Sequence, residues 1–111
     1  MKTAHKIITG LIIALGALHV LVTFHDYDSF SLRALWFASA GVAIILAGFL
    51  NLILMRDVGK DKVVRLLTIF TNLFFALLFA AALFLLPQPQ VFLGSALFVV
   101  ATITSFTVNK G

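Results

Sequence analysis

The chain contains no cysteine and no glutamate, and only 11% of its 111 residues are charged. The absence of cysteine excludes disulfides, thiolate metal ligands and cysteine nucleophiles. The absence of glutamate leaves four aspartates as the only side-chain carboxylates, at positions 26, 28, 57 and 61. A soluble domain of this length needs more polar surface than such a composition supplies. With 62% hydrophobic residues, the chain is predicted to be one membrane domain over residues 1–111.

Four apolar runs divide the chain, at residues 7–24, 34–55, 66–86 and 91–108. A helix needs roughly 20 apolar residues to cross a bilayer, and lipid requires each backbone amide to be satisfied within its segment. Because short polar segments join consecutive runs, the sequence predicts an all-α, four-helix, up-down-up-down transmembrane bundle. A basic start before an apolar run also occurs in signal peptides. The first run continues to Phe24, so we expect it to be an uncleaved helix.

Basic residues are distributed unequally between the two sides of this alternation. Seven of the eight lysines and arginines fall at the N-terminus, in the 56–65 segment or at the C-terminus, and only Arg33 falls on the other side. Cytoplasmic loops of membrane proteins are enriched in these residues, which predicts that both termini are cytoplasmic. Since the positive charges flank apolar runs, their expected partner is anionic lipid and not nucleic acid.

Asn51 and Asn72 stand near the ends of the second and third runs. At about 1.5 Å per residue, both amides are expected at the same depth, on consecutive antiparallel helices. An amide in hydrocarbon needs a hydrogen-bond partner. We therefore predict a direct or water-bridged hydrogen bond between them that sets the register of the hairpin.

Polar side chains also gather where the first and second runs meet. His19 lies deep in the first run, and Thr23 and Asp26 follow it on one helical face. Arg33 ends the connecting segment, and Trp36 lies in the first turn of the second run. Ionisable groups inside membrane segments are candidates for function. These five residues are therefore predicted to form an outward-facing ligand pocket between the first two helices. In the structural alternative, Trp36 is an interfacial aromatic residue and His19 only forms a hydrogen bond to a neighbouring helix. Arg33 then forms a loop ion pair with an aspartate.

Other chemistry has less support in the sequence. His19 and His25 are six residues apart, on different faces of a helix, and no third imidazole lies nearby, so no metal site or cofactor is expected. Haem or metal bound through His19, in an assembly of two chains, is kept as an alternative. No nucleophile–base arrangement or phosphate-binding glycine loop is present, which argues against an enzyme.

Small residues recur at helical spacing in every run, a pattern that permits close helix contact. Packing within the bundle is the expected use of these residues. One such face in a homodimer, or against another membrane protein, is the alternative.

In length and number of helices the chain resembles the small multidrug resistance exporters. Those exporters depend on a glutamate within the first helix, and this chain has none, so the chain is not assigned to that family. The stretch from Ser31 through Leu52 resembles small bacterial membrane proteins, which implies the bacterial inner membrane.

The resulting functional hypothesis is a non-enzymatic membrane protein that binds or passes a small hydrophobic or amphipathic molecule. A structural or accessory subunit of a larger membrane complex is the first alternative, and the haem or metal protein is the second.

Overall fold

The computed structural model describes residues 2–26 and 31–108, without the side chains of Lys2 and Asp26, and this part of the chain is helical. The elements are α1 (Lys2–Asp26), α2 (Leu32–Leu54), the short 3-10 helix η1 (Asp57–Lys60), α3 (Lys62–Leu85) and α4 (Pro89–Ser105). The prediction of an all-helical chain with four main helices is confirmed. Three of these, α1, α2 and α3, are long and apolar enough to cross a membrane. With 17 residues, α4 is a shorter apolar helix.

The helix boundaries differ from the limits of the apolar runs because capping groups, and not hydrophobicity, set them. The Asp61 carboxylate accepts a hydrogen bond from the backbone N–H of Val63 at 2.7 Å, so α3 begins at Lys62, within the charged segment. Similarly, the Ser31 hydroxyl accepts from the N–H of Ala34 at 3.1 Å at the start of α2. Such side-chain caps satisfy the free N–H groups of a first turn. Near the N-terminus of the chain, α1 begins at Lys2, before the first apolar run, and therefore includes His5.

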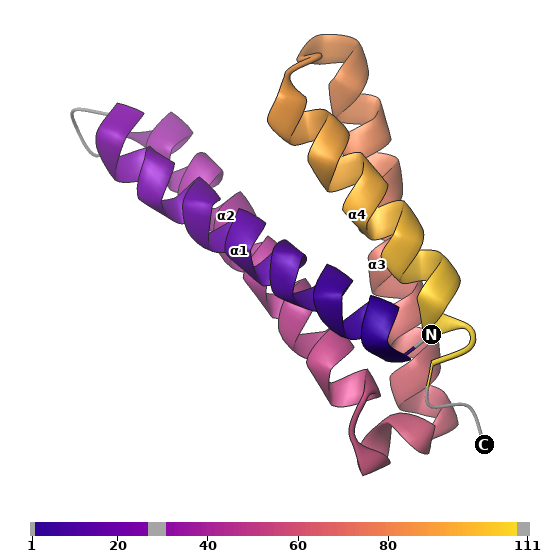
Figure 1. Ribbon diagram of the computed structural model, residues 1–111. Coiled ribbons are helices and arrows are strands. Elements are labelled where there is room, and N and C mark those ends of the chain that lie inside the picture. The colour runs from indigo at the N-terminus through magenta and orange to yellow at the C-terminus, as the bar shows by residue number, and fades with distance from the viewer. Residues whose placement is uncertain (1, 27–30, 109–111) are drawn as a thin grey trace.

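The four helices form two hairpins, α1 with α2 and α3 with α4, and each helix makes most of its contacts within its own hairpin. The hairpins meet at one end of the molecule and diverge toward the other (Figure 1). We call the end where the hairpins meet the η1 end, because η1, the start of α1 and the end of α4 lie there. The wedge end is the opposite one, where the 86–88 turn lies. The molecule measures 49 Å along its longest axis.

Two glycines bring α1 and α2 into close contact. A Cβ atom added at Gly16 would lie 2.8 Å from the carbonyl oxygen of Gly41, and one added at Gly41 would lie 3.0 Å from the carbonyl oxygen of Gly16. Each glycine thus occupies a position where the opposing backbone leaves no room for a side chain. Here small residues serve packing within the chain, which was the use expected for them.

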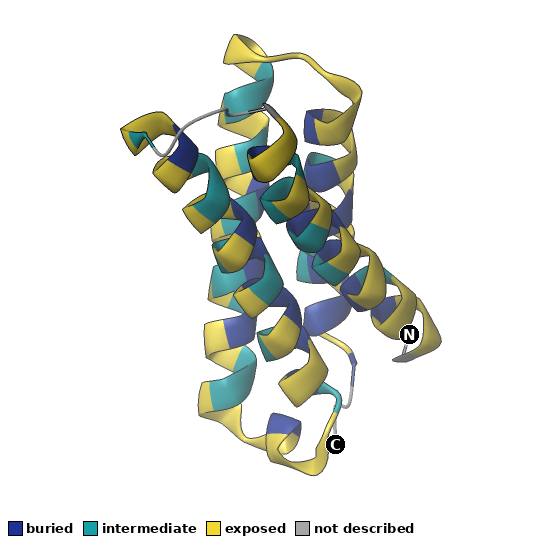
Figure 2. Cartoon of the chain, turned by 90° about the vertical axis from the view of Figure 1, so that its left-hand side faces the viewer, coloured by how far each residue is buried: buried dark blue, intermediate teal, exposed yellow. Residues whose placement is uncertain are grey.

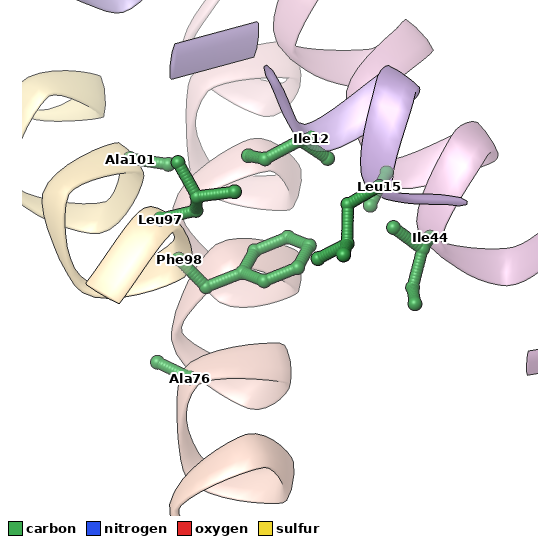
Figure 3. Packing of buried hydrophobic residues seen from close by; sticks show 8 residues of the cluster. Ile12, Leu15, Ile44, Ala76, Leu97, Phe98 and Ala101 are labelled. Carbon is green, nitrogen blue, oxygen red and sulfur yellow. The ribbon is translucent and has the colours of Figure 1, made fainter. Parts of the chain in front are cut away.

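The apolar core lies where the two hairpins cross, and all four helices contribute to it. Buried residues follow the inward faces of the helices, whereas exposed residues cover the outside (Figure 2). Figure 3 shows the ring of Phe98, which is fully buried, directed from α4 toward Leu15 of α1. Phe75 and Phe79 of α3 stack on Phe98 at centroid distances of 4.9 and 5.7 Å. This aromatic cluster belongs to the second hairpin, and Phe98 packs it against Leu15 of the first.

Large apolar side chains cover the outer surface of the helices. Phe70, Phe74 and Phe84 of α3 are more than half exposed, as are Leu21 and Phe24 of α1. In water such a surface would favour aggregation, whereas in lipid it is the surface that spanning helices need. The phenylalanines of α3 therefore divide between the outer surface and the core.

Candidate functional site

A cavity of about 320 Å³ lies between the hairpins at the wedge end, next to Phe79 of the aromatic cluster. Its walls come from α1, α2, α3 and the beginning of α4. The lining residues are Leu15, Leu18, His19, Val22, Phe37, Phe79, Leu86, Gln90 and Val91. Among these described residues none is charged, and only His19 and Gln90 have polar side chains. The cavity is therefore an apolar space with two hydrogen-bonding groups.

His19 occupies the α1 side of this cavity, on the face that Leu15 and Val22 share at spacings of four and three residues. Its ring stacks on Phe37 of α2, with centroids 3.9 Å apart and planes inclined by 16°. The Nε2 atom is buried and has no hydrogen-bond partner among the described residues. Phe37 thus fixes the plane of an imidazole whose Nε2 can still form a hydrogen bond.

Thr23 and Trp36 do not join His19 in the cavity lining. The Thr23 hydroxyl donates to the carbonyl oxygen of His19 at 3.1 Å, so it binds the backbone of its own helix. Trp36 is 68% exposed on the outside of α2. Successive residues of a helix point about 100° apart, and the inward position of α2 belongs to Phe37.

Arg33 is exposed near the start of α2 and does not line the cavity. The Asp26 side chain lies outside the described residues, so its predicted position at the rim has no structural counterpart here. Of the four predicted pocket residues whose side chains the structure describes, His19 alone lines the cavity.

The cavity residues of α3 and α4 were missing from the sequence prediction, which sought the pocket between α1 and α2. Neither Phe79 nor Gln90 is among the pocket residues that the sequence predicts. Hydropathy gives no indication of which hairpin face meets the other. The available signal was the combination of one deep histidine with aromatic residues at the same depth on other helices.

A second polar region lies at the η1 end, where hydrogen bonds join all four helices. Nδ1 of His5 in α1 lies 2.6 Å from Oγ1 of Thr104 in α4, and this hydroxyl donates to the Ala101 carbonyl oxygen at 3.3 Å. The same carbonyl accepts from Nδ2 of Asn72 in α3 at 3.4 Å, and Asn72 bonds Asn51 of α2. We call His5, Thr104, Ala101, Asn72 and Asn51 the polar network.

Asn51 and Asn72 form the centre of this network. Each amide nitrogen donates to the carbonyl oxygen of the other at 2.8 Å, and both residues are fully buried. Asn51 also donates to the Ala47 carbonyl oxygen at 2.8 Å. The sequence predicted a direct or water-bridged bond at this place, and the structure has a direct bond in each direction.

His5 is fully buried, although it precedes the first apolar run in the sequence. Burial occurs because α1 extends back to Lys2 and its first turns pack against α4. Nearby, Arg65 donates from its two terminal nitrogens to the carbonyl oxygens of Ser105 and Val108, both at 2.8 Å. Arg65 was predicted to indicate orientation, and in the structure it also satisfies carbonyl groups at the C-terminal end of α4.

No group of three or more potential metal-binding side chains is present within residues 2–26 and 31–108. Comparison of the chain with protein-family models, curated proteins and solved structures finds no match. Inference about function therefore depends on the geometry of the cavity and of the polar network.

Proposed function

We propose that all four helices cross a bilayer, up-down-up-down, with the η1 end on the cytoplasmic side of a bacterial inner membrane. The apolar outer surface and the length of α1, α2 and α3 support this placement. At about 1.5 Å per residue, the 17 residues of α4 extend for ~25 Å, near the lower limit for a spanning helix. The excess of lysine and arginine around η1 supports the orientation, because such residues are enriched in cytoplasmic loops.

We further propose that the protein binds a small, neutral molecule with an apolar body and one polar group in the cavity at the wedge end. The observation that carries this proposal is an apolar cavity of about 320 Å³ in which His19 presents a buried Nε2 without a partner. Ligand pockets occupy roughly 300–1,000 Å³ and combine apolar walls with a few polar groups. The cavity has both properties at the small end of this range.

The charge of the ligand follows from the lining. Among the described residues around the cavity there is no charged side chain, so a charged ligand would lose its hydration without gaining a counter-ion. A neutral molecule does not incur this cost. Phe37 and Phe79 provide flat apolar walls on two helices, which suit an aromatic or alicyclic body.

A fluorescence titration tests this function with two related probes, neutral N-phenyl-1-naphthylamine and its sulfonated, anionic analogue. The protein is reconstituted in lipid nanodiscs, and the signal of empty nanodiscs is subtracted. We expect saturable binding of the neutral probe and no saturable binding of the anionic one. Val22→Trp fills the cavity and should abolish the saturable signal. His19→Leu should weaken binding roughly threefold to tenfold, the loss of one hydrogen bond of ~1 kcal/mol.

Trp36→Leu is the matched control, because Trp36 is adjacent to the cavity residue Phe37 but faces outward. Circular dichroism establishes that each variant is folded before binding is compared. Equal affinity of wild type and folded Val22→Trp, or tighter binding of the anionic probe, would contradict the proposal.

An accessory role in a larger assembly is the second candidate, favoured by one observation on α1. Gly10 and Ala14 are exposed, and a Cβ added at Gly10 would meet nothing within 4 Å. A small-xxx-small face that is not used within the chain suits another membrane helix. Since the chain has no native cysteine, Gly10→Cys gives an unambiguous test. Disulfide dimers in membranes would indicate a second copy, whereas an adduct of higher mass would indicate another subunit.

A further inference from the structure

The cavity at the wedge end reaches the surface on one side of the molecule. Between the hairpins, α1 packs against α4 and α2 against α3. On the α2–α3 side the lining consists of Phe37 and Phe79, which are both half-buried. On the α1–α4 side it includes Leu18, which is 56% exposed, together with the exposed Leu86 and Gln90. Residues that line a cavity and are also exposed mark the place where it opens.

The depth of this opening follows from the position of Leu18. It precedes His25, the last residue of the apolar span of α1, by seven residues. At about 1.5 Å per residue, Leu18 lies ~10 Å below that end of the span. The hydrocarbon core of a bilayer is about 30 Å thick, so in the proposed placement this edge of the opening lies in the hydrocarbon of the outer leaflet. Gln90, the second residue of α4, lies at the other edge, close to the membrane surface.

The side chains next to the opening are apolar. Leu21 stands one turn beyond Leu18 on α1, and Leu93 stands one turn beyond Gln90 on α4; both are at least half exposed. There is no charged side chain among these residues or among the described residues of the lining. An apolar rim is poorly hydrated, whereas it suits contact with hydrocarbon.

We infer that the cavity takes its ligand sideways from the outer leaflet, through the opening between α1 and α4. This inference rests on the proposed function and names its substrate class, a neutral molecule dissolved in the lipid, which reaches His19 without passing through water. Because lipid tails are as apolar as the lining, transfer from the bilayer into the cavity contributes little to affinity. The hydrogen bond to Nε2 of His19 and the fit against Phe37 then decide which lipid-dissolved molecules bind.

Competition by a tethered ligand tests this route, because the tether confines the ligand to the bilayer. The protein in nanodiscs is first loaded with neutral N-phenyl-1-naphthylamine. The competitor is a phosphatidylcholine with a naphthyl group at the end of one shortened acyl chain. Only a cavity that is open to the lipid can admit this naphthyl group while its headgroup stays at the membrane surface. We expect saturable displacement of the probe by this lipid, and none by the same phosphatidylcholine without the naphthyl group.

Two tryptophan variants locate the opening. Leu18→Trp narrows it from α1, whereas Leu21→Trp adds the same bulk one turn away, at a position that does not line the cavity. In Leu18→Trp we expect the naphthyl lipid to lose affinity, relative to the free probe, by about fivefold or more. In Leu21→Trp we expect wild-type displacement. Circular dichroism establishes that both variants are folded.

The outcomes separate this inference from the proposed function. Absence of saturable binding of the free probe to the wild type would refute the proposed function, and lateral entry with it. Saturable binding of the free probe that the naphthyl lipid does not displace would overturn lateral entry alone. Equal effects of Leu18→Trp and Leu21→Trp would overturn the placement of the opening between α1 and α4. The wild-type competition decides lateral entry even if Leu18→Trp fails to fold.

Discussion

The hydrogen bonds between Asn51 and Asn72 should couple the two hairpins with a measurable free energy. The perturbation is Asn→Leu at each position, singly and together, because leucine has nearly the shape of asparagine and no polar atoms. Each single variant breaks the two mutual bonds and one bond to a backbone carbonyl, Ala47 O for Asn51 and Ala101 O for Asn72. The double variant breaks the same two mutual bonds only once.

The expected magnitude follows from the average value of ~0.6 kcal/mol for a hydrogen bond inside a membrane protein. Three bonds give each single variant a loss of about 1.8 kcal/mol in the free energy of unfolding. Four distinct bonds give the double variant a loss of about 2.4 kcal/mol. The double-mutant cycle then yields a coupling of about 1.2 kcal/mol, which corresponds to the two mutual bonds.

Reversible unfolding in mixed micelles, followed by circular dichroism, measures these free energies. Thr71→Val serves as the control, because the Thr71 hydroxyl bonds only the Leu67 carbonyl of its own helix. We expect this control to change stability by less than about 0.5 kcal/mol. A coupling free energy near zero between Asn51 and Asn72 would refute the assignment of their bonds to hairpin association, even if both single variants were destabilised.

Three further predictions follow from the contacts described above. Gly41→Leu should destabilise the protein by about 1–3 kcal/mol in the same unfolding assay, because its side chain would overlap Gly16; wild-type stability would contradict the close packing of α1 and α2. Arg65→Met should lower the unfolding free energy by about 1–2 kcal/mol, and Arg65→Lys should recover only part of this, since lysine lacks the fork that reaches two carbonyls; full recovery with lysine would show that charge alone suffices. Single cysteines at Lys60 and Gln88 should react with an impermeant maleimide from opposite sides of the membrane, with Gln88 accessible from outside; labelling of both from one side would exclude the proposed topology.

Sequence reasoning succeeded where the physics is local or depends on one helix at a time. Runs of apolar residues near 20 in length predicted four helices, because a backbone in lipid must satisfy its own hydrogen bonds. The depths of Asn51 and Asn72 followed from the rise per residue alone. Their direct bond could be anticipated because both lie about one to two turns from the same connecting segment.

The residues that line the cavity could not be predicted in this way. Trp36 and Phe37 are adjacent in the sequence and equally plausible as pocket residues, and only the rotation of α2 against α1 puts the phenylalanine inside. That rotation is set by Gly16 and Gly41, whose backbones lie so close that neither position has room for a Cβ atom. Phe79 lines the cavity because the second hairpin packs across the first. This contact joins residues that are distant in the sequence.

The sequence by itself therefore determined the number of helices, their apolar outer surface and the asymmetric distribution of basic charge, all of which depend on composition and periodicity. Only the tertiary structure decided that His5 is buried and that the His19 cavity lies between hairpins instead of within one. The physical reason is that large apolar residues also cover the outer faces of the helices, so which face is inward depends on the fit between helices. Small differences in shape, at glycine, asparagine and phenylalanine positions, select one such fit.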